Sequence, residues 1–277
     1  MKIKMLNWAK QFNIFCFLDN HQYDFRPQRY ECVLAAGIKQ GISNSTSPLE
    51  DLDKLLRKKD WVFGHLNYEA GYSYNGLHSG RQDQTGFPLF KFFIPETVVY
   101  IAGGELHIEG SNPNSIYDEI IRQEDTVGHH TSGINLSQAL SRDRYIDIIE
   151  KLKDHIHRGD CYEINFCQDF YADDVLIDPF TVYHNLVQLS PNPFSALYRL
   201  EDSYLMCASP ERFLFKEGDT IISQPMKGTA KRDSQNRDRD EAKLVALQNS
   251  AKEQAENVMV VDLVRNDLSR VCKEGTV

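Results

Sequence analysis

The fold of this chain is decided by the stretch SPERFLFKEGDTIISQPMKGT, residues 209–229. It holds two runs of β-favouring residues, 213–215 and 220–222, separated by Glu-Gly-Asp at 217–219. Glycine followed by aspartate between two such runs is a strong hairpin signal. The two runs are therefore predicted to pair as antiparallel strands.

The open end of this hairpin brings a carboxylate toward an amine. A two-residue loop, Gly-Asp, places Glu211 opposite Met226 and beside Lys227. A three-residue loop, Glu-Gly-Asp, places Glu211 opposite Pro225 and diagonal to Lys227 on the same face. Pairing should stop at Pro225, which has no N–H, and Gly228 frees the backbone just after the lysine.

Two interpretations of this acid and lysine remain open. An exposed ion pair between Glu211 and Lys227 is the simpler one, because such pairs are common and contribute little to stability. A functional pair is favoured by the surroundings, since both residues lie in breaks bounded by proline and glycine. In such breaks a side chain can face a ligand instead of a neighbouring residue.

Composition limits the possible partners. The chain has 277 residues, 41% of them hydrophobic, and a formal net charge of −9 from 31 basic and 40 acidic residues. This balance argues against a nucleic-acid or anionic-membrane surface, and a small anionic substrate would need a local cation, either a lysine or a bound metal.

The sequence shows no signal peptide and no membrane-spanning run, which predicts a cytoplasmic protein. Six cysteines without a Cys-x-x-Cys pair are expected to be reduced apolar fillers.

Hydrophobic periodicity predicts a strand-rich region at 1–125, a linker at 126–140 and a second region at 141–277, all interwoven into one domain. Strands are expected at 12–18, 30–37, 61–69, 88–95, 98–101, 106–108, 162–166 and 194–199. Helices are expected at 49–59, 116–123, 142–158 and 179–189, and the apolar face of the third should pack on a sheet. The polar run 230–239 is expected to be a loop, either mobile over the site or simply solvated.

A further helix should begin at Ser250. Ser250 and Glu253 fit a capping box, in which hydroxyl and carboxylate satisfy each other's backbone amides. Glu253 and Glu256 are three residues apart and share one face of that helix. They are either exposed acids near a helix N-terminus or carboxylates that share a cation.

Three motifs resemble those of the chorismate-utilising enzymes, in the order and at the spacing of that family. They are SPE at 209–211, QPMKGT at 224–229 and KEQAENVMVVDLVRNDL at 252–268. The resemblance implies an α+β fold of stacked antiparallel sheets flanked by helices. Lysine before Gly-Thr is similar to the branch that forms 4-amino-4-deoxychorismate, whereas anthranilate synthases typically carry alanine there.

The resemblance also implies a reaction and its residues. Chorismate would be aminated with ammonia from a glutamine amidotransferase subunit, toward para-aminobenzoate and folate. Lys227 would be the nucleophile that displaces the C4 hydroxyl, and Glu211 the general acid that protonates it; burial would tune the pKa of each. Gly228 and Thr229 would bind substrate. Magnesium would be held directly by Glu256, with Glu253 as a secondary or water-mediated ligand.

One departure and one limit accompany this resemblance. GDCYEINF at 159–166 resembles an active-site strand of the family, but Glu163 stands where aminating members have glutamine and isochorismate-forming members a lysine. Glu163 is either a substrate contact or an ordinary exposed strand residue. The chain stops at Val277, within the region that the family's domain covers. We therefore expect this polypeptide alone to be inactive, with an uncovered apolar face on its last helix.

Two alternatives to this function remain. Within the family, the chain could belong to an anthranilate synthase or another chorismate-utilising enzyme, and the identity of the product would distinguish these. A non-catalytic chorismate-binding or regulatory subunit is the alternative from another class. Chorismate binding without turnover would favour it.

Overall fold

The structure of this chain, a computed structural model, describes all residues except 25–26, 44–46, 75, 78–84 and 129–132. It divides into two compact units. The first combines Met1–Thr126 with Asn185–Val277, and the second is Val127–His184. The predicted linker, 126–140, lies where the second unit begins.

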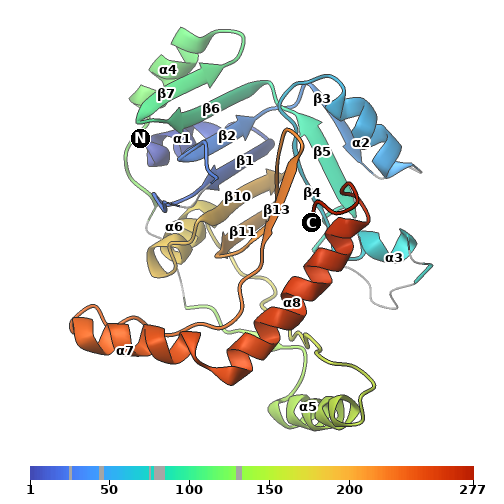
Figure 1. The fold of residues 1–277 in the computed structure, drawn as a ribbon. Helices are drawn as coiled ribbons and strands as arrows, with labels where there is room; N and C mark the ends of the chain where they lie inside the picture. The colour runs from blue at the N-terminus through green and yellow to red at the C-terminus, as the bar shows by residue number, and fades with distance from the viewer. Residues whose placement is uncertain (25–26, 44–46, 75, 78–84, 129–132) are drawn as a thin grey trace. The chain divides into compact units, whose positions relative to one another are not determined.

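A six-stranded antiparallel sheet forms the centre of the first unit (Figure 1). Its strands, in spatial order, are β11 (Ser203–Ser209), β10 (Phe194–Leu200), β1 (Ile14–Asp19), β2 (Cys32–Ala36), β6 (Thr97–Ala102) and β7 (Glu105–Glu109). In its centre Phe17 pairs with Leu34 on one side and Leu197 on the other. The strands predicted from apolar runs in these regions are confirmed.

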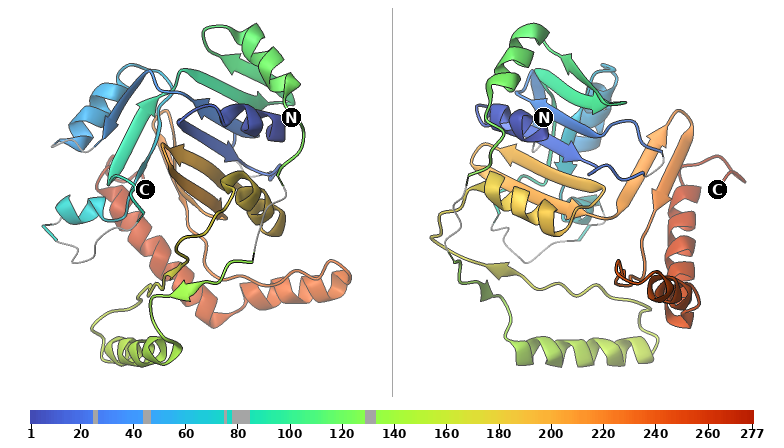
Figure 2. Two further views of the ribbon diagram at one scale, coloured as in Figure 1. Left: turned by 180° about the vertical axis from the view of Figure 1, so that it is seen from behind. Right: turned by 90° about the vertical axis from the view of Figure 1, so that its left-hand side faces the viewer.

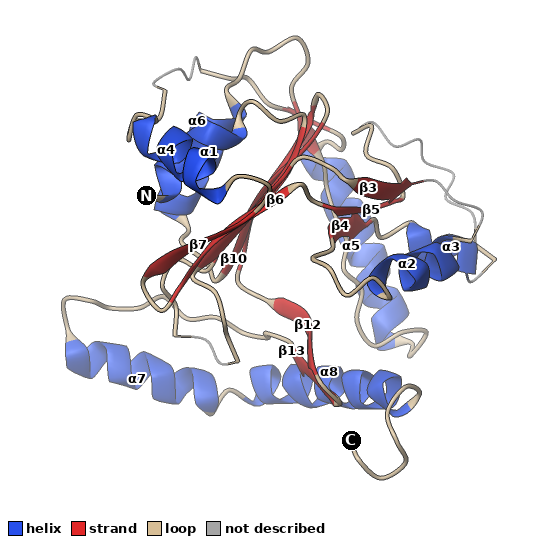
Figure 3. Cartoon of the chain, turned by 90° about the horizontal axis from the view of Figure 1, so that it is seen from above, coloured by secondary structure: helices blue, strands red, loops and turns tan. Residues whose placement is uncertain are grey.

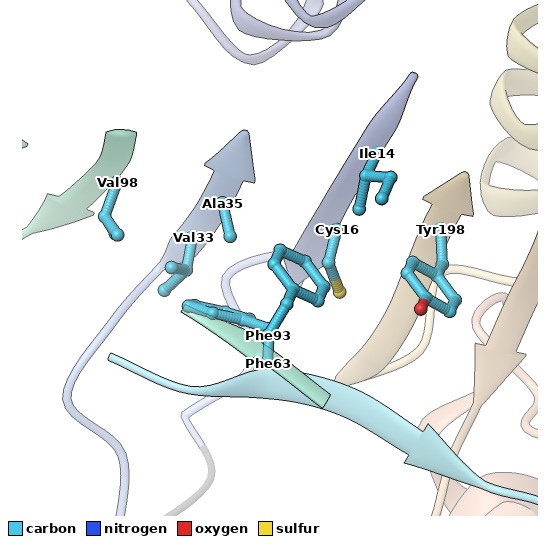
Figure 4. Packing of buried hydrophobic residues seen from close by; sticks show 8 residues of the cluster. All are labelled: Ile14, Cys16, Val33, Ala35, Phe63, Phe93, Val98 and Tyr198. Carbon is cyan, nitrogen blue, oxygen red and sulfur yellow. The ribbon is translucent and has the colours of Figure 1, made fainter. Parts of the chain in front are cut away.

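A three-stranded sheet packs on one face of the larger sheet (Figure 3). It has the order β3 (Gln40–Ser43), β5 (Phe90–Ile94), β4 (Phe63–Leu66). Figure 4 shows Phe63 and Phe93 of the smaller sheet meeting the larger one, together with the other core residues Ile14, Cys16, Val33, Ala35, Val98 and Tyr198. Burial raises the pKa of the Cys16 thiol to about 12, so this cysteine is an apolar filler, as expected. The predicted stacking of antiparallel sheets is confirmed.

Helices cover the opposite face of the six-stranded sheet. Helices α1 (Lys2–Ala9) and α4 (Pro113–Arg122) contact each other, and they contact β2 and β7 respectively (Figure 2). Because side chains alternate along a strand, Phe15 and Phe17 point to this face while Ile14 and Cys16 point to the other. Both faces are therefore buried, which explains the nearly continuous apolar run of β1.

The rest of the first unit follows the sheets. Helices α2 (Pro48–Leu56) and α3 (Ala70–Tyr74) lie between strands in sequence, and the predicted hairpin forms as β12 (Arg212–Glu217) and β13 (Thr220–Gln224). Helices α7 (Arg237–Gln248) and α8 (Ala251–Ser269) come after it. The loop predicted for 230–239 is wrong at its end, because the side chain of Asn236 accepts a hydrogen bond from the Arg239 amide and starts α7.

The second unit holds α5 (Arg142–His157), the short pair β8 (Ser137–Gln138) and β9 (Phe170–Tyr171), and the first half of α6 (Pro179–Leu189). Ser141 caps α5 by accepting from the Arg144 amide, and no residue of α5 is buried. The packing of α5 on a sheet stays a prediction. The strand predicted at 162–166 is also wrong. The segment is irregular because no described strand pairs with it, and Tyr162 is 89% exposed. Among the described residues, no helix is both long and apolar enough to cross a bilayer.

Candidate active site

The hairpin combines the two loop alternatives. Its loop has two residues, since Glu217 pairs with Thr220. A β-bulge between Arg212 and Phe215 then shifts the register by one, so that Arg212 pairs with Gln224. Extending this register places Glu211 opposite Pro225, as a three-residue loop would have done, and diagonal to Lys227.

Glu211 lies in a tight turn just before β12. Its backbone N–H donates to Ser209 Oγ at 3.2 Å, and the same hydroxyl donates to the Glu211 carbonyl at 3.2 Å. At this end of the hairpin Glu211 is exposed and Lys227 is half-buried. The dry surroundings expected for Glu211 are therefore absent from this structure, because the hairpin end is open to solvent.

Gly228, just after the hairpin, packs against a residue of α8. Its backbone has φ +73°, in the left-handed region that favours glycine. A Cβ added at Gly228 would lie 2.3 Å from Oε2 of Glu253, so only a glycine leaves room for this carboxylate. The residue after Lys227 thus packs directly on one of the predicted metal ligands.

The predicted capping box forms only in part. Ser250 Oγ accepts from the Glu253 amide at 3.4 Å, as expected. The reciprocal bond is replaced, because the Ser250 amide donates to the carbonyl of Leu247 at 3.3 Å. The Glu253 carboxylate instead lies between Gly228 and Lys252, whose Nζ is 3.7 Å from its Oε1.

Glu253 and Glu256 provide oxygen donors on one face of α8. Among the described residues, no group of three or more histidine, cysteine, aspartate or glutamate side chains is arranged around one point. Magnesium nevertheless binds proteins through one or two carboxylates and keeps several waters or substrate oxygens. The carboxylates of Glu253 and Glu256, three residues apart on α8, are oxygen donors of the kind that such an ion takes.

The other two predicted site residues, Thr229 and Glu163, are both exposed. Thr229 follows Gly228 and is exposed. Glu163 belongs to the second unit, where it is exposed in the irregular segment that follows α5. The structure therefore brings together Gly228, Glu253 and Glu256, and it puts Glu211 and Lys227 at the same end of one hairpin.

Sequence reasoning missed Arg212, which anchors the hairpin. Its guanidinium lies 5.0 Å from the ring centre of Phe194 and 5.1 Å from that of Phe215. It also donates to the carbonyl of Pro27 at 2.8 Å, and burial lowers its pKa. An ion pair between Arg29 and Glu217 connects the other end of the hairpin to the same N-terminal segment. No local pattern signals these contacts, because they join residues far apart in sequence.

Comparison with known proteins gives the family. Residues 18–277 match the model of the chorismate binding enzymes. The match covers most of the chain and includes the hairpin, Gly228 and the start of α8. The chain belongs to the chorismate-binding enzyme family.

Individual relatives carry two different names. Aminodeoxychorismate synthase component 1 of Escherichia coli (strain K12) is 39% identical over 140 residues, which are 50% of this chain and 30% of that protein. Anthranilate synthase component 1 of Archaeoglobus fulgidus is 29% identical over 244 residues, 85% of this chain and 54% of that protein. The chain thus spans about half or less of the length of these curated relatives.

A solved structure supports the fold. Anthranilate synthase component I from Streptococcus pneumoniae TIGR4 superimposes with a TM-score of 0.74 at 20% identity, covering 90% of this chain and 63% of that one. At this identity the likeness concerns the fold alone. The predicted α+β fold of the chorismate-utilising enzymes is confirmed.

Proposed function

We propose that this protein aminates chorismate to 4-amino-4-deoxychorismate, with ammonia delivered by a glutamine amidotransferase partner. The observation that carries the proposal is Lys227, half-buried beside a left-handed Gly228 and at the same hairpin end as Glu211. The name of the Escherichia coli relative supports it. A soluble protein of the cytoplasm is the corresponding expectation.

In this proposal the hairpin supplies both reacting groups. The Lys227 amine forms a bond to the chorismate ring while the C4–O bond breaks, and Glu211 gives its proton to the departing hydroxyl, which leaves as water. Ammonia then forms the C4–N bond as the bond to Lys227 breaks. Closure of the site around Glu211 is part of the proposal, because a carboxyl acts as an acid near neutral pH only in a drier environment.

The residues of α8 and the adjoining loop would hold the substrate. Glu256, with Glu253 as the secondary ligand, would hold Mg²⁺, which would neutralise a substrate carboxylate that the net charge of −9 repels. Gly228 and Thr229 would contact the substrate next to Lys227. Glu163 stays a candidate substrate contact.

Anthranilate formation is the second candidate function. It is favoured by the relative from Archaeoglobus fulgidus, which matches 85% of the chain. Lys227 argues against it, because an amine at this position offers a covalent route that alanine would not. A non-catalytic chorismate-binding subunit would bind chorismate without releasing either product.

Product analysis distinguishes these functions. We expect full-length protein, incubated with chorismate, Mg²⁺ and ammonia, to release 4-amino-4-deoxychorismate, detected by liquid chromatography and mass spectrometry. Lys227→Ala should lower the rate about a hundredfold or more, because it removes the nucleophile. Lys231→Ala removes an exposed lysine from the same loop and should leave the rate unchanged. Release of anthranilate would refute the proposal, as would full activity of the Lys227→Ala variant.

A further inference from the structure

Lys252 lies between the two carboxylates that are proposed to hold Mg²⁺. Its Nζ is 3.4 Å from Oε1 of Glu256 and 3.7 Å from Oε1 of Glu253. The lysine side chain is 75% exposed, against 36% for Glu256 and 23% for Glu253. The ammonium of Lys252 therefore contacts two carboxylates at once, and both are less exposed than the lysine itself.

The stability of α8 does not explain a lysine at this position. The helix begins at Ala251, so Lys252 lies in the first turn, where the helix dipole disfavours a cation. Its pair with Glu256 has the lysine N-terminal to the glutamate, which is the weaker orientation of an i,i+4 pair. The lysine is placed against local preference, and such departures are typical of functional positions.

We propose that Lys252 is a positioning residue, the counter-ion of Glu253 and Glu256 in the metal-free protein, which a divalent cation displaces on binding. This inference rests on the proposed role of the two glutamates as magnesium ligands. Without a cation, two carboxylates on one helix face repel each other. The ammonium of Lys252 keeps them together, and Gly228 lies close to the Glu253 carboxylate.

Displacement of the lysine costs little. Exposed ion pairs contribute little to stability, and a lysine side chain can move its charged end into water. A divalent cation brings twice the charge to the same oxygens. The lysine therefore competes with the metal, and its removal should tighten metal binding about threefold to tenfold at low salt. The difference should shrink at high salt, because the competition is electrostatic.

Manganese binding by the protein tests this directly, with Mn²⁺ as a magnesium substitute whose free form gives an electron paramagnetic resonance signal. Lys252→Gln keeps the length of the side chain without its charge, and Lys252→Arg keeps the charge. Lys151→Gln is the matched control, because Lys151 forms an exposed i,i+4 pair with Asp147 on α5 and its loss changes the net charge equally. Glu256→Gln tests whether the ion binds at α8. Far-UV circular dichroism checks that each variant folds.

We expect tighter binding in Lys252→Gln alone, wild-type binding in Lys252→Arg and Lys151→Gln, and loss of binding in Glu256→Gln. Equal affinity of the wild type and Lys252→Gln would overturn the counter-ion role and leave the metal site standing. Equal tightening by Lys151→Gln would also overturn it, since net charge would then be the cause. No binding in any variant, or binding that Glu256→Gln does not weaken, would overturn the metal site itself.

Discussion

Gly228 is the residue at which the backbone conformation and the proposed site depend on each other most directly. Its left-handed φ of +73° would strain any other residue, and the space beside it is filled by the Glu253 carboxylate. Because that carboxylate is the free end of a flexible side chain, a methyl group at Gly228 would move it instead of unfolding the loop. The glycine therefore sets the position of a proposed ligand.

Replacement of this glycine should separate the two effects. Gly228→Ala and Gly218→Ala should each lower the free energy of unfolding in urea by about 1–2 kcal/mol, because both glycines have positive φ. Gly218 has no atom within 4 Å of an added Cβ, so it controls for backbone strain. Only Gly228→Ala should also weaken Mn²⁺ binding. Equal Mn²⁺ affinity in the two variants would contradict the role of Gly228 in placing Glu253.

At the scale of single residues, the sequence predicted which side chains approach one another but not all of their contacts. The i,i+3 spacing was enough to put Glu253 and Glu256 on one face of a helix. It could not show that Glu253 turns away from Ser250, because that choice depends on Gly228, which is distant in sequence. The i,i+4 spacing of Lys252 and Glu256 was a signal that went unused.

Among the elements, the hairpin shows how a small irregularity changes a site. The bulge adds one residue to β12, so Arg212 and Phe215 lie on the same face and the aromatic ring reaches the guanidinium. The same shift places Glu211 opposite Pro225 instead of Met226. Loop length, the only register signal in the sequence, cannot reveal a bulge that tertiary contacts of Arg212 stabilise.

The anchoring role of Arg212 predicts a local loss of order. Arg212→Met keeps much of the bulk but removes the hydrogen bond to Pro27 and the cation–π contacts, which together are worth about 2 kcal/mol. Amide hydrogen exchange in β12 and β13 should become faster than in the six-stranded sheet. Lys216→Met, on the exposed side of the same strand, is the control. Unchanged protection of the hairpin in Arg212→Met would show that Arg212 does not anchor it.

Other elements were predicted well where both faces of a strand are buried and poorly where no described strand pairs with the segment. The apolar runs of β1, β5 and β6 are strands because helices or a second sheet cover them. The alternation at 162–166 is strand-like, yet without a pairing partner the segment is irregular. Helix α7 was not predicted, because its charged first turn resembles a solvated loop.

On the scale of the whole molecule, the two stacked sheets enclose a buried core, whereas the C-terminal helix α8 is exposed. No residue of α8 is buried, and Val258 and Val261, which share one face, are 68% and 50% exposed. This confirms the expected uncovered apolar face. The family and its fold thus follow from motifs and buried strands, whereas the proposed product rests on the proposed chemistry of Lys227.

The most direct test of that chemistry is a mass spectrum of full-length protein, quenched after mixing with chorismate and Mg²⁺ without ammonia. The account predicts an adduct with the mass of chorismate less one water, because the C4 hydroxyl leaves as Lys227 bonds to the ring. The adduct should be absent from Lys227→Ala. If the wild type forms no adduct and the Lys227→Ala variant still makes 4-amino-4-deoxychorismate at the normal rate, Lys227 is not the nucleophile.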